Sequence, residues 1–166
     1  PEHYAVQPFG QVPWIEEDGT VVFETGAILL YLAEKSPVLM PAGSRASVTQ
    51  WTFAALNSIE SAAMAWALPR FTGAEHAPAA ATMTQTWVTM RMQQMEAVLS
   101  GRDWLTASFS VADIAMVDVL RFIDRFDGLA DAPVCRAYVA RATARPAFVK
   151  ALSDQMTHFE TADAAR

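Results

Sequence analysis

The first third of the chain contains two strand-like runs, and no convincing strand follows them. Residues 12–23 are two β-prone runs on either side of Asp18-Gly19, a dipeptide that suits the two positive-φ positions of a type I′ turn. Residues 25–34 change to the compact apolar pattern of a helix. Ser36-Pro37 ends this helix, because proline disfavours helical geometry in the residue before it. The first unit is therefore predicted to be strand, turn, strand and helix.

From about residue 44 onward, the apolar residues recur at helical spacing. Residues 47–71 are predicted to form one long helix, with an apolar series made of Val48, Trp51, Ala55, Ile59, Ala62 and Trp66. A second helix, with an apolar face that includes Val88 and Leu99, is predicted to end at Ser100-Gly101.

Further helix starts are marked by capping residues and by prolines. Ser110 and Asp113 resemble a capping box with Asp in place of Glu, which predicts a helix that begins at Ser110. Pro133 and Pro146 each suit a first helical position, where the missing N–H costs nothing. The second unit is therefore predicted to be an all-α bundle of about five helices.

These patterns divide the chain into an α/β unit at 1–36, a linker at 37–44 and an all-α domain at 45–166. A lone two-stranded hairpin is at best marginally stable in water, because it buries too little apolar surface to offset the ordering of its backbone. We therefore expect additional strands, either upstream of Pro1 in a longer chain or from a second molecule. The absence of an initiating Met favours the first of these alternatives.

Composition and charge exclude several classes of partner. The net charge is −6, and the 12 Lys and Arg residues form no basic run, so nucleic acid is not an expected partner. No stretch approaches the roughly 20 apolar residues of a membrane span, so no membrane partner is expected either. The single Cys135 cannot form an internal disulfide, which is typical of a reducing compartment and favours the cytoplasm. The scattered histidines, His3, His76 and His158, have no metal-ligand spacing, so no metal is expected.

Several motifs occur in a consistent order along the chain. They are Gln7-Pro8-Phe9-Gly10-Gln11-Val12-Pro13, Asp18-Gly19, residues 24–32, residues 109–115 and Arg145-Pro146-Ala147-Phe148. Together they resemble the glutathione transferases. The resemblance implies the glutathione transferase fold: a thioredoxin-like α/β domain, here only its C-terminal part at 1–36, followed by the all-α domain.

The resemblance also implies a glutathione site at Gln11, Val12, Pro13, Glu24 and Thr25. In the family, the peptide bond before Pro13 is cis, and the Val12 N–H and C=O pair with the cysteinyl part of glutathione in the manner of an added strand. Thr25 and the start of its helix would hold the γ-glutamyl carboxylate, and Glu24 would hold the ammonium group. The Gln11 side-chain amide would contact the same peptide. The local sequence alone leaves two alternatives open: a plain helix N-terminus at Glu24-Thr25 and a trans proline at a strand edge.

Catalysis in the family depends on lowering the thiol pKa of glutathione, because the thiolate is the nucleophile. A Ser, Tyr or Cys near the start of the domain usually does this, and the resemblance implies that the present chain begins after that segment. No catalytic residue is therefore assigned within it. Cys135 is interpreted as a small buried hydrophobe and not as a nucleophile. Asn57 and Ser61 are predicted to face the pocket for the acceptor substrate, with a solvated helix face as the alternative.

The expected function is that of an enzyme that binds glutathione as co-substrate and transfers it to a small hydrophobic electrophile. Two alternatives remain: a non-catalytic binding or assembly module, and an inactive truncated relative. The resemblance also implies a homodimer.

Overall fold

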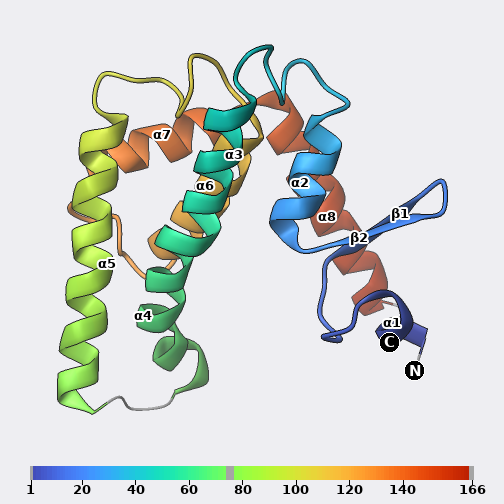
Figure 1. Cartoon of the computed structure of the whole chain (residues 1–166). Helices are drawn as coiled ribbons and strands as arrows, with labels where there is room; N and C mark the ends of the chain where they lie inside the picture. Colours follow the sequence, from blue (N-terminus) through green and yellow to red (C-terminus); the bar gives the residue numbers. More distant parts are fainter. Residues whose placement is uncertain (1, 74–76, 165–166) are drawn as a thin grey trace.

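The computed structural model describes residues 2–73 and 77–164. The two strands lie in the first part of the described chain, and helices follow them (Figure 1). This arrangement confirms the predicted partial α/β unit followed by an all-α bundle. In chain order the elements are α1 (Glu2–Val6), β1 (Trp14–Glu17), β2 (Thr20–Phe23), α2 (Thr25–Ala33), α3 (Arg45–Phe53), η1 (Ala54–Glu60), α4 (Ser61–Thr72), α5 (Pro78–Leu99), α6 (Val111–Asp124), α7 (Pro133–Thr143) and α8 (Pro146–Ala164).

The predicted hairpin is confirmed. Strands β1 and β2 are antiparallel, with Trp14 opposite Phe23. At the turn Asp18 has φ 50° and Gly19 has φ 75°, which are the two positive values that a type I′ turn requires. The chain then enters α2, which packs against both strands. The predicted strand, turn, strand and helix are therefore all present.

The long helix predicted at 47–71 is also present, but its hydrogen bonding changes in the middle. α3, η1 and α4 follow one another without a break from Arg45 to Thr72, and η1 is a π-helical segment (Figure 1). A π-turn holds one more residue than the corresponding α-turn, so it changes which side chains face a neighbouring element. Such segments are frequent at functional sites.

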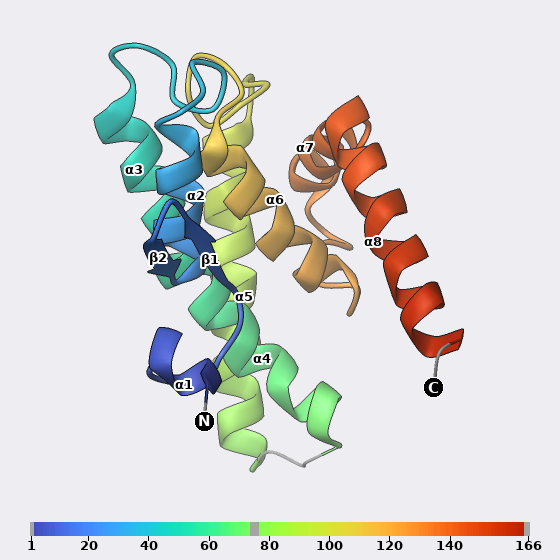
Figure 2. The same ribbon diagram turned by 90° about the vertical axis from the view of Figure 1, so that its right-hand side faces the viewer.

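Helix α6 is the centre of the hydrophobic core. It packs against α2, α3, η1, α4 and α7, and Figure 2 shows it between the α2–α3 side of the molecule and the α7–α8 side. Because it is surrounded by other helices, it buries residues on most of its faces. The buried residues of α6 are Val111, Ala112, Asp113, Ala115, Met116, Val117, Val119, Leu120 and Ile123.

The capping box predicted at the start of α6 is confirmed, and Asp113 does more than cap the helix. One carboxylate oxygen accepts a hydrogen bond from the Ser110 N–H at 2.8 Å. The other accepts from the Leu105 N–H at 2.9 Å and from the Tyr138 hydroxyl at 2.7 Å. Asp113 is fully buried, so this one carboxylate joins the start of α6 to the preceding loop and to α7.

The segment between the α/β unit and the bundle is tied to α6 as well. The N–H of Val111, the first residue of α6, donates to the carbonyl oxygen of Leu39 at 3.0 Å. The first N–H groups of a helix have no partner within the helix. In α6, one of these N–H groups, that of Val111, finds its partner outside the helix, in a backbone carbonyl of the predicted linker.

Pro133 and Pro146 are the first residues of α7 and α8, as predicted. The start of α7 is capped from another helix, because the Glu96 carboxylate of α5 accepts from the Cys135 N–H at 2.6 Å. Cys135 is fully buried in the core, which confirms its interpretation as a small buried hydrophobe. Burial, together with the hydrogen bond to Glu96, raises the pKa of the Cys135 thiol to about 12.

The raised pKa of Cys135 predicts a loss of stability in alkaline solution. The folded state holds the thiol proton more tightly than the unfolded state, so this stabilisation is complete below the unfolded thiol pKa and is lost as pH rises toward 12. We expect urea unfolding to show a decrease of about 1 kcal/mol in unfolding free energy between pH 9 and pH 10. Cys135→Ala should show a clearly smaller decrease, which comes in part from the buried Tyr138 hydroxyl, whose pKa burial also raises; an equal decrease in the variant would contradict the assignment.

None of the helices within 2–73 and 77–164 is long and apolar enough to cross a membrane. In the same part of the chain, no group of three or more His, Cys, Asp or Glu side chains is arranged to hold a metal ion. His76 lies outside the described residues.

Candidate functional site

The loop between α1 and β1 is organised around a buried glutamine. Gln7 is only 2% exposed, and its side-chain oxygen accepts from the Phe9 N–H at 2.7 Å and from the Gln11 N–H at 3.2 Å. Gly10 has φ 67°, and a Cβ there would lie 2.6 Å from the Tyr4 ring. Glycine is therefore favoured at this turn by its backbone angle, and any side chain there would also displace the exposed Tyr4 ring.

Val12 follows this loop and leaves its backbone polar groups available. Its peptide bond to Pro13 is cis, as the family resemblance implies. The Val12 side chain is 80% exposed, and neither its N–H nor its C=O forms a hydrogen bond within 2–73 and 77–164. A backbone segment with both groups free is able to pair with an extended peptide.

Glu24 and Thr25 form the junction between β2 and α2. Glu24 has φ 73° and ψ 123° and makes no side-chain cap to the helix. A residue other than glycine in this region carries about 1–3 kcal/mol of backbone strain, and such strain is frequent at functional sites. The Glu24 carbonyl accepts from the Ile28 N–H at 2.9 Å, which is the first hydrogen bond of α2. The N–H groups of residues 25–27 come before this bond and are therefore available to an anion.

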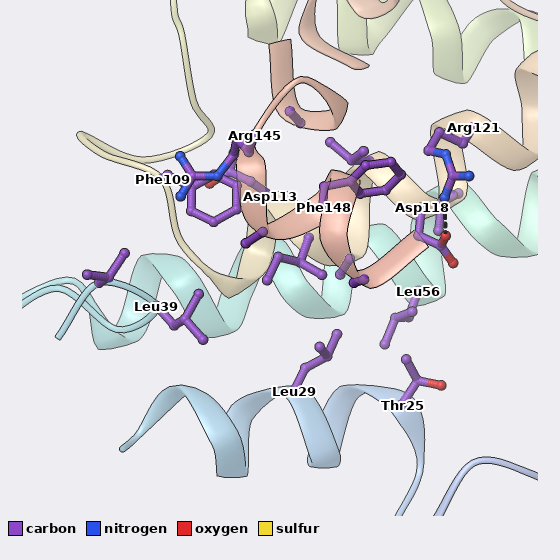
Figure 3. Close-up of a pocket in the computed structure, with 18 of the residues that line it drawn as sticks. Thr25, Leu29, Leu39, Leu56, Phe109, Asp113, Asp118, Arg121, Arg145 and Phe148 are labelled. Atoms are coloured by element: carbon purple, nitrogen blue, oxygen red, sulfur yellow. Dashed lines mark hydrogen bonds and ion pairs between the residues drawn. The ribbon is translucent and has the colours of Figure 1, made fainter. Parts of the chain in front are cut away.

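A cavity of about 710 Å³ lies between α2, η1, α6 and α8. In Figure 3, Thr25, Leu56, Asp118 and Arg121 lie toward one end of the cavity, and Phe109 lies toward the other. Most of the lining is apolar. The complete set of lining residues is Thr25, Leu29, Ser36, Val38, Leu39, Leu56, Glu60, Phe109, Asp113, Ile114, Ala115, Val117, Asp118, Val119, Arg121, Ala142, Arg145, Ala147, Phe148 and Ala151.

Charged groups lie toward both ends of the cavity: Arg145 lies 3.6 Å from the centre of the Phe109 ring, and Asp118 and Arg121 lie toward Thr25. Burial raises the pKa of the Glu60 carboxyl, and the nearby charge of Asp118 adds to this effect. Asp118 pairs with Arg121 at 3.3 Å, and the Arg121 guanidinium lies 4.8 Å from the centre of the Phe148 ring. The cavity is thus a largely apolar space with a few charged side chains, which is the usual form of a site for a small molecule.

The residues predicted to bind glutathione lie partly in the lining of the cavity and partly on the exposed surface at the ends of the hairpin. Thr25 lines the cavity. Gln11, Val12 and Glu24 are exposed but are not part of its lining. The hairpin links the two places, since it begins after Pro13 and leads directly into Glu24.

Asn57 and Ser61 are both exposed, and the Ser61 hydroxyl donates to the Asn57 carbonyl at 2.8 Å. They are not among the lining residues, so their role in the acceptor pocket stays a prediction. The cavity is lined instead by Leu56 and Glu60 of the π segment, each one residue earlier. Glu60 and Gln7 are the polar residues that the sequence analysis missed. For Glu60, the only signal in the sequence is its position within an apolar helical series. For Gln7, it is the proline that follows.

Comparison with protein-family models identifies both parts of the chain. Residues 1–34 match the N-terminal domain model of glutathione S-transferase, and residues 59–146 match the C-terminal domain model. The chain belongs to the glutathione S-transferase family. A search of curated proteins gives no match.

Solved structures agree with the family assignment. The structure of a sphingomonad glutathione S-transferase complexed with glutathione is 28% identical to this chain, with a TM-score of 0.77 over 91% of this chain and 77% of the other. A ternary complex of BphK, a bacterial glutathione S-transferase, is 25% identical, with a TM-score of 0.80 over 93% and 78%. Glutathione S-transferase 1-6 from Anopheles dirus species B is 20% identical and shows the shared fold, with a TM-score of 0.81 over 99% and 81%.

Proposed function

We propose that this glutathione S-transferase family member binds glutathione through Gln11, Val12, Pro13, Glu24 and Thr25. The observation that carries the proposal is the free backbone of Val12, which stands at the start of the hairpin that ends at the helix junction. An extended peptide that pairs with Val12 gains two backbone hydrogen bonds. The sphingomonad relative was solved in complex with glutathione, which supports the same ligand for this chain.

The γ-glutamyl end of glutathione carries a carboxylate and an ammonium group, and the helix junction offers complementary partners. The N-terminal N–H groups of α2 and the Thr25 hydroxyl suit the carboxylate. Glu24 is exposed and makes no side-chain cap to α2, so its carboxylate is available to the ammonium group. The Gln11 side chain, which is exposed beside Val12, is proposed as a further polar contact to the peptide.

For the second substrate, we propose a small hydrophobic electrophile at the Thr25 end of the cavity. Leu56 supplies an apolar wall there, and Glu60 supplies a partly buried carboxyl. Asn57 and Ser61 are next to these two positions along the helix, at the outer edge of this proposed acceptor site. The reaction is nucleophilic attack by the glutathione thiolate on the electrophile. No residue of this chain is assigned the catalytic role.

We also propose a homodimer in a reducing compartment such as the cytoplasm. Large apolar side chains are exposed along the helix from α3 to α4, as expected of a surface that is covered in an assembly; they are Phe53, Met64, Leu68 and Phe71. Sedimentation at the monomer mass alone would contradict the dimer.

Calorimetric titration tests the proposed ligand. We expect saturable binding of glutathione, and at least tenfold weaker binding of the dipeptide Cys-Gly, because the dipeptide lacks the γ-glutamyl group that Glu24 and Thr25 would hold. A folded chain that binds neither compound would contradict the proposal and would favour the non-catalytic assembly module. Equal affinity for both compounds would contradict the roles of Glu24 and Thr25.

A further inference from the structure

Two side chains outside the proposed set of ligand contacts hold the backbone on either side of Gln11. Gln7 accepts the Gln11 N–H at 3.2 Å. On the other side, the Nε2 of His3 lies 2.9 Å from the Gln11 carbonyl oxygen, so the tautomer with a proton on Nε2 donates to it. His3 belongs to α1, and the Gln7 N–H donates to the His3 carbonyl at 2.9 Å. Both side chains therefore project from α1 and the residue that follows it, and both hold the backbone of Gln11.

The geometry of the peptide unit connects these contacts with Val12. The Gln11 carbonyl and the Val12 N–H belong to the same peptide bond, and a trans peptide is planar with its C=O and N–H pointing in opposite directions. Because His3 holds the Gln11 carbonyl on the α1 side, the Val12 N–H must point away from α1. Gln7 restrains Gln11 as well, because its side-chain oxygen accepts from the Gln11 N–H. Val12 is the next residue, and its own N–H and C=O have no partner within the described residues.

We propose that Gln7 and His3 are positioning residues for glutathione, which fix the Gln11–Val12 peptide so that Val12 is presented as a ready strand edge. This inference rests on the proposed binding of glutathione at Val12. Neither residue needs to contact the ligand. Their effect is to remove the conformational freedom that binding would otherwise have to restrict, which is how preorganisation raises affinity.

The burial of Gln7 supports a role beyond that of an ordinary loop residue. Its oxygen serves two backbone donors, and at 2% exposure no solvent replaces that oxygen if it is removed. Glutamate keeps an oxygen at the same position, whereas leucine keeps the approximate size and removes the acceptor. The pair of substitutions therefore separates hydrogen bonding from packing.

The test is calorimetric titration of glutathione into the wild type, Gln7→Leu, Gln7→Glu and the control Gln93→Leu, which lies exposed on α5. We expect about tenfold weaker binding for Gln7→Leu, a change of less than about threefold for Gln7→Glu, and no change for the control. His3→Phe should weaken binding in the same way, and His3→Gln, which keeps a donor, should restore most of it. The His3 pair gives the answer if Gln7→Leu fails to fold.

A second ligand distinguishes positioning of Val12 from a general loss of structure. Glutathione methylated on the cysteinyl nitrogen cannot complete the strand-like pair with Val12. We expect the wild type to bind it about tenfold more weakly than glutathione, and Gln7→Leu to discriminate by less than about threefold. Undiminished discrimination, or unchanged affinity for glutathione in folded Gln7→Leu and His3→Phe, would overturn the inference and leave the proposed function intact. Failure of the wild type to bind glutathione would instead refute the proposed function.

Discussion

Replacing Asp113 with alanine is expected to lower the free energy of unfolding by about 4 kcal/mol. The substitution removes the partner of two backbone N–H groups and of the Tyr138 hydroxyl in a fully buried place. A buried donor left without a partner costs about 1–3 kcal/mol, so three such donors lead to a loss of about 4 kcal/mol toward the lower end of that range. For a chain of this size, the midpoint of thermal unfolding should fall by roughly 8–16 °C. Urea and thermal unfolding, followed by circular dichroism, measure the two quantities.

Asp118→Ala provides a matched control on the same helix. The Asp118 side chain is 80% exposed, and its ion pair with Arg121 is at the surface. Exposed pairs contribute about 0–1 kcal/mol, so the control should change stability by less than about 1 kcal/mol. A loss of similar size in both variants would show that the hydrogen bonds of Asp113 do not stabilise the fold.

Replacing Glu24 and Thr25 together with alanine is expected to weaken glutathione binding by about 100-fold. The double variant loses the hydroxyl proposed to donate to the γ-glutamyl carboxylate and the carboxylate proposed to pair with the ammonium group. The start of α2 remains, so a residual contribution from its N–H groups is expected. Calorimetric titration at neutral pH measures the change, and Thr20→Ala, at an exposed position in β2, is the control.

The backbone at Glu24 offers a way to separate binding from folding. Glycine tolerates φ 73°, so Glu24→Gly should be at least as stable as the wild type even though it lacks the carboxylate. A variant that is equally stable and binds glutathione less tightly would place the effect in the ligand site. Unchanged affinity in both this variant and the double variant would refute the proposed roles of Glu24 and Thr25.

Local signals were sufficient to predict most of the fold. Asp18-Gly19 specifies its turn through two positive φ angles, and Ser110 with Asp113 specifies a helix start through reciprocal hydrogen bonds. Each of these signals acts within a few residues, so the sequence displays it directly. The bond from Tyr138 to Asp113 spans 25 residues. No local pattern predicts such a contact, because it depends on how α6 and α7 pack.

The candidate site was less predictable, for the same reason. Leu56 and Glu60 of the π segment line the cavity, whereas the polar pair Asn57 and Ser61, predicted from the family resemblance, stays a prediction. A π-turn has no dependable sequence signature, and it alters the face of every residue beyond it relative to a regular helix. The buried position of Gln7 depends on the turn that follows α1, in which its side-chain oxygen accepts from two backbone N–H groups.

The bond between the Leu39 carbonyl and the Val111 N–H limits how the two halves of the molecule can move. Rotation about the 37–44 segment would break it and leave the first N–H of α6 without a partner, beside the buried Asp113 network. The bond therefore disfavours rotation about this segment. The same bond holds the linker side of the cavity, where Leu39 is a lining residue, against the start of α6, so we expect that wall to keep its position when a ligand binds.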